Sequence, residues 1–363
     1  MKRSFILFIL GIFLFSCSQE SSDQPEKGAK GEKGSAVTGK VHVMKLGLIT
    51  PLKDRESLDF GSAQNWFFKD KLEELSKGRI KVELHGASAL GGPRSLLVQT
   101  KKGTVQGCDA EGAYLSFFLP QAQILSLPYI FPSEEVAWRV LSLDSQFMKD
   151  FNKFFIKKTG MRIISMGENG GGFRHLSNNK REIRTPADLK GLKMRVMRLP
   201  IHIEWMKALG ASPTPISWTE LYTALQTGVV DGQENPISTF KFGGFTEVQK
   251  YMTLDAHVFG IYCLIINNNW YRSLPKDLQK AVTHCGNLTT KVNIGISQHM
   301  QIQDLAYIKS KGVQVYVPTQ EEKDMFKKLS MDKVLKLAKK QLGDKWVNKI
   351  LRAIDKAKKE VNI

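Results

Sequence analysis

The sequence lacks the residue patterns on which most metalloproteins and many enzymes depend. Its 363 residues include only four cysteines and seven histidines, without metal-ligand spacing and without a histidine pair at i and i+4, which argues against a zinc site. A G-x-S-x-G elbow, a P-loop and a Cys/His catalytic signature are all missing. No repeat of 20–50 residues points to a solenoid or propeller. We therefore expect no metal, no cofactor and no enzymatic activity.

Acidic residues are scarce, since 35 Asp and Glu stand against 53 Lys and Arg, for a net charge of +18. Many of the cations lie in the tail at residues 323–359, between apolar residues at helical spacing. This spacing predicts an amphipathic helix with a solvated basic face. Contact with anionic lipid or with a partner is the alternative. The apolar residues are Leu335, Leu342, Trp346, Ile350 and Ile354.

Three cysteines follow Cys17, an odd number that fits no complete set of disulfides. Cys263 lies in the apolar run GIYCLII, so we expect it to be a buried thiol. The pattern leaves open one disulfide among Cys108, Cys263 and Cys285.

The chain begins with MKRSFILFILGIFLFSC, two basic residues followed by an apolar run. That run is too short for a membrane-spanning helix, which needs about 20 residues, and is typical of an export signal over residues 1–16. Cys17 after Leu14-Phe15-Ser16 resembles the lipobox of bacterial lipoproteins, which implies cleavage before Cys17 and lipid attachment to it. Phe15 departs from the small residue usual there, so secretion with a different cut is the alternative.

Residues 17–40 contain no aromatic residue and few apolar ones, which predicts a disordered tether. We expect the folded part to lie in the periplasm, anchored to a membrane through this lipidated segment. Nucleic acid is not an expected partner despite the positive charge, because an exported protein meets little of it.

The folded part alternates between strand and helix patterns. A strand over residues 41–50, a helix ending near Gly78 and the alternation of Ile80, Val82 and Leu84 form a βαβ unit. Residues 133–160 predict one long helix, and MRIISMG returns to strand. The length suggests two domains, and the alternation predicts α/β lobes with largely parallel sheets.

The segment TPADLKGLKMRVM contains an arginine with two possible roles. Thr185 and Pro186 suit the start of a short helix that ends at Gly191, and residues 192–197 suit a strand. Arg195 is then a charge in a mostly apolar strand. It is either an edge-strand arginine in water or an anchor that holds a carboxylate through two parallel hydrogen bonds.

The segment LYTALQTGVVDGQENP combines a helix with a turn. Ser217 and Glu220 fit a capping box, and Gly228 fits the residue after the helix. Asp231-Gly232 is typical of a turn. Asn235 before Pro236 suits the N-cap of another helix, whose start could also bind an anion.

Four segments carry a resemblance to a known family: LSLPYIF, GGGFRHLSN, TPADLKGLKMRV and LGASPTPISWTELYTALQTGVVDGQENP. Over residues 43–345 the chain resembles the DctP-like solute-binding proteins of TRAP (tripartite ATP-independent periplasmic) transporters. The resemblance implies an α/β fold, a two-lobed periplasmic-binding-protein clamshell with a central ligand cleft and a long bracing helix. We expect lobe I at residues 41–171 plus 261–300, and lobe II with the C-terminal helices at residues 172–260 plus 301–363.

The same resemblance implies which residues bind the ligand. Arg195 matches the family's main carboxylate anchor, and Arg174 matches the arginine of its GxR motif. Trp218 matches the aromatic residue after the PTP turn, and Asn235 matches the amide of the QENP motif.

The chain departs from the family just after Arg195, where proline and a small or polar residue are frequent but Met197 and Arg198 stand. If Phe173, Met197 and Trp218 line the cleft, they favour an acid with an apolar part. A second carboxylate could be met by Arg174 or Arg198.

The resemblance implies a receptor that binds a small organic acid and delivers it to TRAP membrane subunits, in some members with a periplasmic tetratricopeptide-repeat protein. A ligand sensor or partner-docking lipoprotein of the same fold is the alternative. An enzyme would need a site such as an acid pair of Asp231 and Glu234, steadied by Arg174 and Arg195.

Overall fold

The computed structural model describes residues 39–362. The predicted signal at residues 1–16, the lipidation site Cys17 and the tether up to residue 38 lie outside the described residues. Within residues 39–362, no helix is long and apolar enough to cross a membrane. The lipid anchor therefore stays a prediction.

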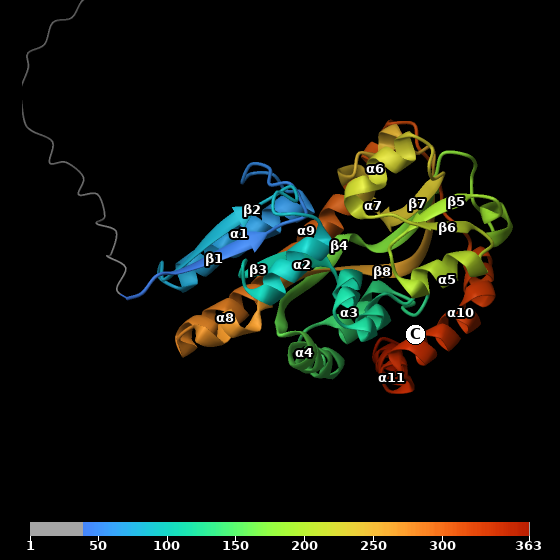
Figure 1. The fold of residues 1–363 in the computed structure, drawn as a ribbon. Helices are drawn as coiled ribbons and strands as arrows, with labels where there is room; N and C mark the ends of the chain where they lie inside the picture. The colour runs from blue at the N-terminus through green and yellow to red at the C-terminus, as the bar shows by residue number, and fades with distance from the viewer. Residues whose placement is uncertain (1–38, 363) are drawn as a thin grey trace, which may run out of the picture. The chain divides into compact units, whose positions relative to one another are not determined.

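A single nine-stranded sheet organises the described residues (Figure 1). Its strand order is β2-β1-β3-β8-β4-β7-β5-β6, and β9 pairs with β8. The strands are β1 (His42–Gly47), β2 (Ile80–His85), β3 (Gly107–Glu111), β4 (Met161–Asn178), β5 (Lys193–Val196), β6 (Ser212–Pro215), β7 (Gly232–Pro236), β8 (Tyr251–Asn267) and β9 (Gln314–Tyr316).

The predicted parallel sheets are correct at the two ends of this sheet and incomplete in its middle. β1 pairs in parallel with β2 and β3, and β5 pairs in parallel with β6 and β7. The two long strands β4 and β8 are antiparallel to each other and join the two ends. This arrangement confirms the mixed α/β class and gives two parallel units linked by shared strands. The residue boundaries of the lobes stay a prediction.

The helices cover the sheet, and the 35-residue α9 is the long bracing helix that we expected. It packs on α1, β4 and α7, which belong to both ends of the sheet. The helices are α1 (Phe60–Leu75), α2 (Pro93–Lys102), α3 (Glu134–Leu141), α4 (Gln146–Thr159), α5 (Pro200–Ala208), α6 (Trp218–Gln226), α7 (Ile237–Phe242), α8 (Asn268–Ser273), α9 (Lys276–Ser310), α10 (Gln320–Leu342) and α11 (Asp344–Glu360), with 3₁₀ turns η1 (Gly112–Phe117), η2 (Pro120–Ser126), η3 (Pro186–Leu189) and η4 (Phe245–Glu247).

Two predicted helices are each broken into two. The prediction of one helix over residues 133–160 is wrong because Ser145 caps a new helix, its Oγ accepting the backbone N–H of Met148 at 3.0 Å. The tail helix is also wrong as a single element, because Gly343 adopts a φ of 86° between α10 and α11. Its apolar stripe is nevertheless on the inner side, since Ile350 and Ile354 are buried.

Two capping predictions at α6 and α7 are wrong. Ser217 precedes α6, but its side chain makes no capping hydrogen bond, whereas Gly228 does follow the helix with a φ of 73°. Asn235 lies within β7, and Pro236 occupies the N-cap position of α7. The Asn235 amide consequently makes its contacts at the centre of the molecule, with Arg174 and Gln233.

Three consecutive glycines interrupt the pairing of the long strands. Glu168 pairs with Ile261 and Phe173 pairs with Phe259, so four residues of β4 face the single residue Gly260 of β8. Gly170, Gly171 and Gly172 have φ values of 60°, 102° and 72°, which other residues rarely adopt. The motif GGG thus forms a β-bulge where both strands pass between the two ends of the sheet.

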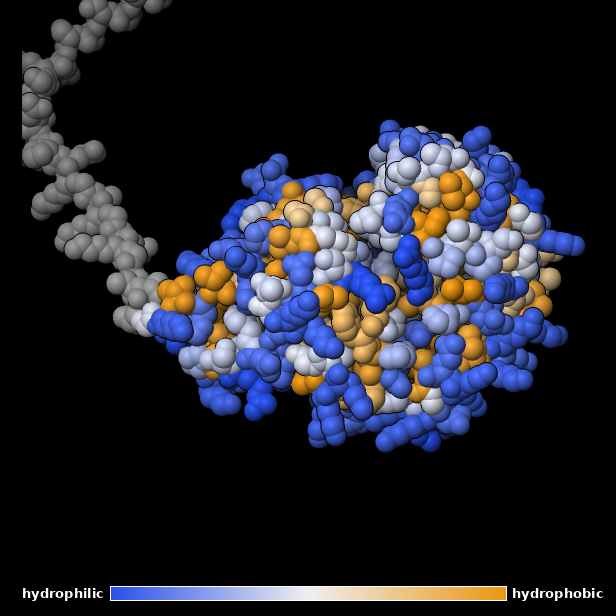
Figure 2. Space-filling model, in the orientation of Figure 1, coloured by the Kyte–Doolittle hydropathy of each residue, from blue (hydrophilic) through white to orange (hydrophobic). Residues whose placement is uncertain are grey.

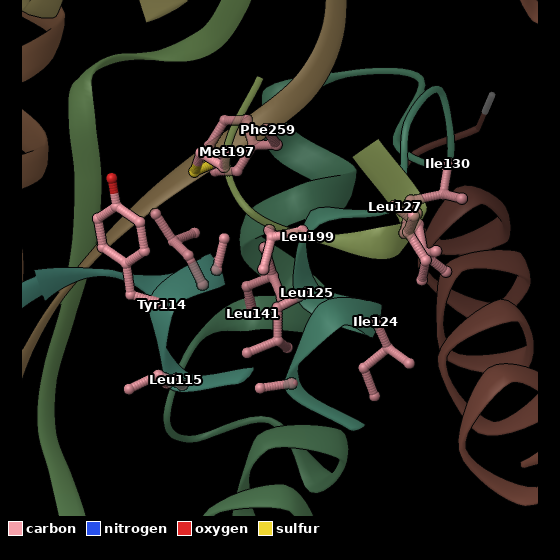
Figure 3. Packing of buried hydrophobic residues seen from close by; sticks show 14 of the residues in the cluster. Tyr114, Leu115, Ile124, Leu125, Leu127, Ile130, Leu141, Met197, Leu199 and Phe259 are labelled. Atoms are coloured by element: carbon pink, nitrogen blue, oxygen red, sulfur yellow. The ribbon is translucent and has the colours of Figure 1, made fainter. Parts of the chain in front are cut away.

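The largest cluster of buried apolar side chains includes residues of β3, β4, β5 and β8, in the middle of the sheet. Figure 3 shows Tyr114 at its border, with the ring hydroxyl pointing away from Leu115 and Leu125. Met197 belongs to the same cluster and is 2% exposed. These two side chains therefore have an apolar side in the core and a second side that can face a ligand.

Candidate functional site

A narrow cavity, with about 430 Å³ of empty space when the part open to solvent is counted, lies at the carboxyl ends of parallel strands from both ends of the sheet. Figure 2 shows a hollow between the surface over α1 and β2 and the surface over α6. The first end of the sheet contributes Ile49, Thr50, Glu111 and Tyr114. The crossing strands contribute Asn169, Arg174 and Tyr262. The second end contributes Arg195, Met197, Trp218, Asn235, Thr239 and Phe242.

Arg195 lies on this cavity in an interior strand, because β5 is paired on both sides by β6 and β7. The alternative of an edge-strand arginine in water is wrong, since the side chain is 1% exposed. Its Nε donates to the Ile216 carbonyl at 2.9 Å, which fixes the guanidinium. Nη2 is buried and has no hydrogen-bond partner among the described residues. A buried cation with a spare donor beside a cavity is suited to an anion.

Arg174 also lines the cavity, but most of its donors are already occupied. Its Nε donates to Glu234 Oε2 at 2.5 Å, and Nη2 donates to Glu234 Oε1 at 3.0 Å and to the Glu234 carbonyl at 2.7 Å. Burial opposes its charge, yet the Glu234 and Glu111 carboxylates raise the pKa of Arg174 above its ordinary value. Arg174 therefore stays charged, and its Nη1 is the nitrogen that faces Glu111.

Glu234 continues a buried polar network away from the cavity. His257 Nε2 lies 3.1 Å from Glu234 Oε2, and His257 Nδ1 lies 2.9 Å from Asp255 Oδ2. Burial alone would raise the pKa of Glu234, but Arg174 and His257 hold it well below the usual range. The Tyr129 hydroxyl donates to Asp255 at 3.1 Å. Its partners keep Glu234 charged, so the network is a rigid support for Arg174.

Asp231 and Glu234, the carboxylates considered as an acid pair, each accept hydrogen bonds from other groups. Asp231 Oδ2 accepts the backbone N–H of Lys193 at 2.9 Å, which joins β7 to β5. Glu234 is fully buried in its bonds to Arg174 and His257. Neither carboxylate lines the cavity. The geometry therefore gives no support to acid–base chemistry by these two residues.

Asn235 faces the cavity from β7 rather than from a helix start. Its Oδ1 accepts from Arg174 Nη2 at 3.0 Å, and its Nδ2 donates to Gln233 Oε1 at 2.5 Å. An amide nitrogen has two hydrogens. One hydrogen of Nδ2 is consequently available for a ligand.

Aromatic and apolar side chains form one wall of the cavity. Trp218 stacks on Phe242 with ring centroids 6.1 Å apart, and Met197 also lines the cavity. Phe173 is not among the lining residues, because its ring packs edge-on against Phe259 with centroids 5.2 Å apart. The structure thus brings five of the six predicted ligand-binding residues to one cavity.

A wider groove of about 760 Å³ continues outward from Arg195, Met197 and Trp218. It contains Arg198, whose Nη2 lies 3.6 Å from Glu220 Oε2 with both side chains exposed. Arg94 lines the same groove. Exposed pairs of this kind are weak, so a ligand anion could displace Glu220 from Arg198.

The sequence interpretation missed the polar residues contributed by the first end of the sheet, above all Glu111. This residue ends β3 and is 5% exposed, and its Oε2 accepts the backbone N–H of Ala113 at 3.2 Å. Burial raises the pKa of Glu111 to about 7. The available signal was an acid in the otherwise apolar run AEGAYL, which no motif marks as part of a site.

Metal and disulfide chemistry have no structural basis in residues 39–362. No group of three or more His, Cys, Asp or Glu side chains in this range could hold a metal ion. Cys108, Cys263 and Cys285 are all buried free thiols, so the alternative of a disulfide among them is wrong and the buried thiol at Cys263 is confirmed.

Comparisons with known proteins agree with this geometry. Residues 55–341 match the family model "DctP: Bacterial extracellular solute-binding protein, family 7". The sialic acid-binding periplasmic protein SiaP of Vibrio cholerae is 33% identical over 266 residues, 72% of this chain and 79% of SiaP.

Solved structures show the same fold. The sugar acid binding protein DctPAm of Advenella mimigardefordensis, in complex with galactonate, is 29% identical with a TM-score of 0.80, over 88% of this chain and 99% of that one. A TRAP periplasmic solute binding protein of Sulfurospirillum deleyianum with bound succinate is 27% identical with a TM-score of 0.76, over 86% and 99% of the two chains.

Proposed function

Because the chain belongs to family 7 of the bacterial extracellular solute-binding proteins, the DctP-like receptors of TRAP transporters, we propose that it binds a small organic carboxylate and delivers it to membrane permease subunits. Proteins of this family are periplasmic solute receptors with a two-lobed α/β fold, and they are not enzymes. The relatives bound to galactonate and succinate support a carboxylate as the ligand.

The observation that carries this proposal is the spare donor of Arg195. The guanidinium is fixed by the Ile216 carbonyl, buried, and lacks a partner for Nη2 on the cavity side. Leaving a charged donor unpaired in the interior costs free energy that a carboxylate ligand would recover. Arg195 is therefore the proposed anchor.

The other lining residues supply the remaining contacts. Asn235 offers an amide hydrogen, Arg174 offers Nη1 and the charge of its guanidinium, and Met197 and Trp218 offer apolar surface. Hydrogen bonds to charged groups contribute about 1.5–3 kcal/mol each, and micromolar affinity requires about 8 kcal/mol. This set of contacts is sufficient for micromolar binding. Phe173 is left out of the proposed site because it packs on Phe259.

Movement between the two ends of the sheet would close the cavity over its ligand. The contacts come from both ends, so a ligand stabilises the closed form more than the open one. The glycine bulge at Gly170–Gly172 lies on the strands that connect the ends, and its residues can absorb changes in φ and ψ. Closure would mark the loaded receptor for the permease.

A ligand screen by thermal unfolding tests the proposal. A ligand at about 100 times its Kd stabilises the folded state by roughly 2.7 kcal/mol, enough to shift the melting temperature. We expect a shift with at least one small mono- or dicarboxylate. Copurification of permease subunits with the full chain separates a transport receptor from a sensor or docking lipoprotein, for which no permease would copurify.

A further inference from the structure

One side of the C-terminal helix α10 combines lysines with exposed apolar side chains. Residues 325–342 contain six lysines and a single acidic residue, Asp332. Met325 and Leu329 are 49% and 48% exposed, and they lie one helical turn apart. Neither side chain belongs to the apolar cluster that the rest of α10 packs into. These two residues therefore contribute nothing to the core, and an external contact would explain them.

The exposed residues form a continuous stripe along α10. Met325, Leu329 and Lys333 follow one another at intervals of four residues, and Lys336 and Lys340 continue the row at intervals of three and four. Residues at these intervals lie on one side of a helix. The other side of α10 is buried through Phe326, Ser330, Val334, Ala338 and Leu342. We call the stripe of Met325, Leu329, Lys333, Lys336 and Lys340 the α10 face.

The charges of the α10 face are not neutralised by neighbouring acids. Lys333, Lys336 and Lys340 are exposed, and no ion pair in residues 39–362 involves a lysine of α10. The adjoining helix α11 adds six Lys and Arg against three Asp and Glu. The result is a positive surface that attracts a negatively charged one.

The chemistry of the α10 face favours a lipid surface over a protein partner. Lysine is depleted at protein–protein interfaces, where arginine is enriched, and the cations of α10 are all lysines. A lysine ammonium on a flexible apolar stem is suited to the phosphates of lipid headgroups. Met325 and Leu329 are suited to the boundary between headgroups and acyl chains, where the apolar residues of interfacial helices are buried.

Contact through the α10 face would leave the ligand site uncovered. Among the described residues, none from α10 or α11 lines the cavity or the wider groove. Figure 1 shows both helices away from α1 and α6, between which Figure 2 shows the hollow. A receptor docked in this way could still bind its solute.

We propose that the α10 face docks on a membrane surface rich in anionic phospholipid, with its two apolar side chains entering the headgroup region and its three lysines binding phosphates. This inference goes beyond the proposed function, because it uses neither the cavity nor a lipid anchor. Docking would hold the receptor at the membrane in an orientation that keeps its cavity accessible.

Vesicle flotation tests the proposal. The chain from residue 18 onward keeps every residue that the structure describes and lacks the signal and Cys17, and a cooperative thermal transition would establish that it is folded. Vesicles of equal parts phosphatidylcholine and phosphatidylglycerol should bind it at least about tenfold more tightly than vesicles of phosphatidylcholine alone, because each lysine near an anionic surface adds attraction. Equal affinity for the two kinds of vesicle, or binding to neither, would overturn the proposal.

Charge reversal assigns the binding to α10. The triple variant Lys333→Glu, Lys336→Glu and Lys340→Glu should weaken binding to the anionic vesicles at least about tenfold, and glutamine replaces glutamate if that variant does not fold. The matched control makes the same change of charge at three exposed lysines on one side of α9, and should weaken binding by less than about threefold. These lysines are Lys276, Lys280 and Lys291. Equal losses in the two triple variants would show attraction to net charge alone and contradict the proposal.

The apolar contribution has its own variant. Met325→Ser combined with Leu329→Ser keeps the charge and should still weaken binding to the anionic vesicles, because the apolar side chains no longer enter the headgroup region. Undiminished binding by this variant would contradict the docking geometry. All of these variants should keep the thermal shift with a carboxylate ligand, so failure of the proposal is distinguishable from failure of the proposed function.

Discussion

The guanidinium of Arg174 donates to both carboxylate oxygens of Glu234, from Nε at 2.5 Å and from Nη2 at 3.0 Å. The two side chains are 1% and 0% exposed, so each neutralises a charge that water cannot reach. Removal of one partner from such a pair leaves an uncompensated buried charge, which costs about 3–5 kcal/mol.

We therefore expect Arg174→Ala to lower the free energy of unfolding of the unliganded protein by about 3–5 kcal/mol in urea titrations. Arg195→Ala is the matched control, because the partners it loses, the Ile216 carbonyl and the Tyr114 hydroxyl, are neutral, and it should cost less, about 1–2 kcal/mol. An Arg174→Ala protein as stable as the wild type would show that the pair is not a structural support.

Stability should fall as the pH rises from about 5 to 7.5. Burial, together with the nearby Glu134, raises the pKa of Glu168 to about 7. The folded state then keeps a proton that the unfolded state has lost, so the stabilisation is complete below the unfolded pKa and disappears as the pH passes the folded pKa. Burial also raises the pKa of Asp109 and the pKa of Glu111 to about 7, so these two groups act in the same direction. Burial lowers the pKa of His175 to about 3 and the pKa of His202 to about 4, and these two histidines offset part of the fall.

Glu168→Gln removes one of these titrations while keeping an oxygen that can accept from Trp138 Nε1, a bond of 2.9 Å in the wild type. The loss of stability between pH 5 and 7.5 should shrink by on the order of 2–3 kcal/mol, measured by chemical unfolding at each pH. A variant whose pH profile parallels the wild type would show that Glu168 is ionised at low pH in the folded protein.

Binding should compact the protein, because the cavity is lined by both ends of the sheet and the glycine bulge lies between them. Small-angle scattering with and without a saturating ligand would record a smaller radius of gyration in the complex. A constant radius, with binding shown independently by calorimetry, would rule out closure.

Cys17 lies outside the described residues, and its role is tested in cells. If Cys17 carries lipid, Cys17→Ser should move the protein from the membrane fraction to the soluble fraction. Cys108→Ser is a suitable control because that thiol is buried and free. Unchanged fractionation of Cys17→Ser would leave secretion without a lipid anchor as the better interpretation.

Local patterns predicted the elements that depend on neighbouring residues. A strand-like run predicted β1, and alternation predicted β2 and β5. Thr185 starts the short helix η3 through a reciprocal capping box with Asp188. The break at Ser145 was missed because the apolar spacing continues across it. Periodicity reports which residues face the core and does not report a change in helix direction.

The site was predictable only in part, for a related reason. Arg195 was identifiable as a charge in an apolar strand, but its interior position depends on β6 and β7, which pair with it from other parts of the chain. The Phe173 ring packs on β8 instead of lining the cavity, and Glu111 joins the cavity through the order of the strands. Such contacts follow from tertiary packing and not from spacing.

The central claim, that Arg195 anchors a carboxylate, is tested most directly by ligand-induced thermal shifts of matched variants. With a carboxylate that stabilises the wild type, Arg195→Lys should give a smaller shift, because an ammonium cannot present the planar fork of a guanidinium. Arg195→Ala should give no shift while its unliganded form remains folded. A full shift in Arg195→Ala would contradict the account, since the carboxylate would then be held elsewhere.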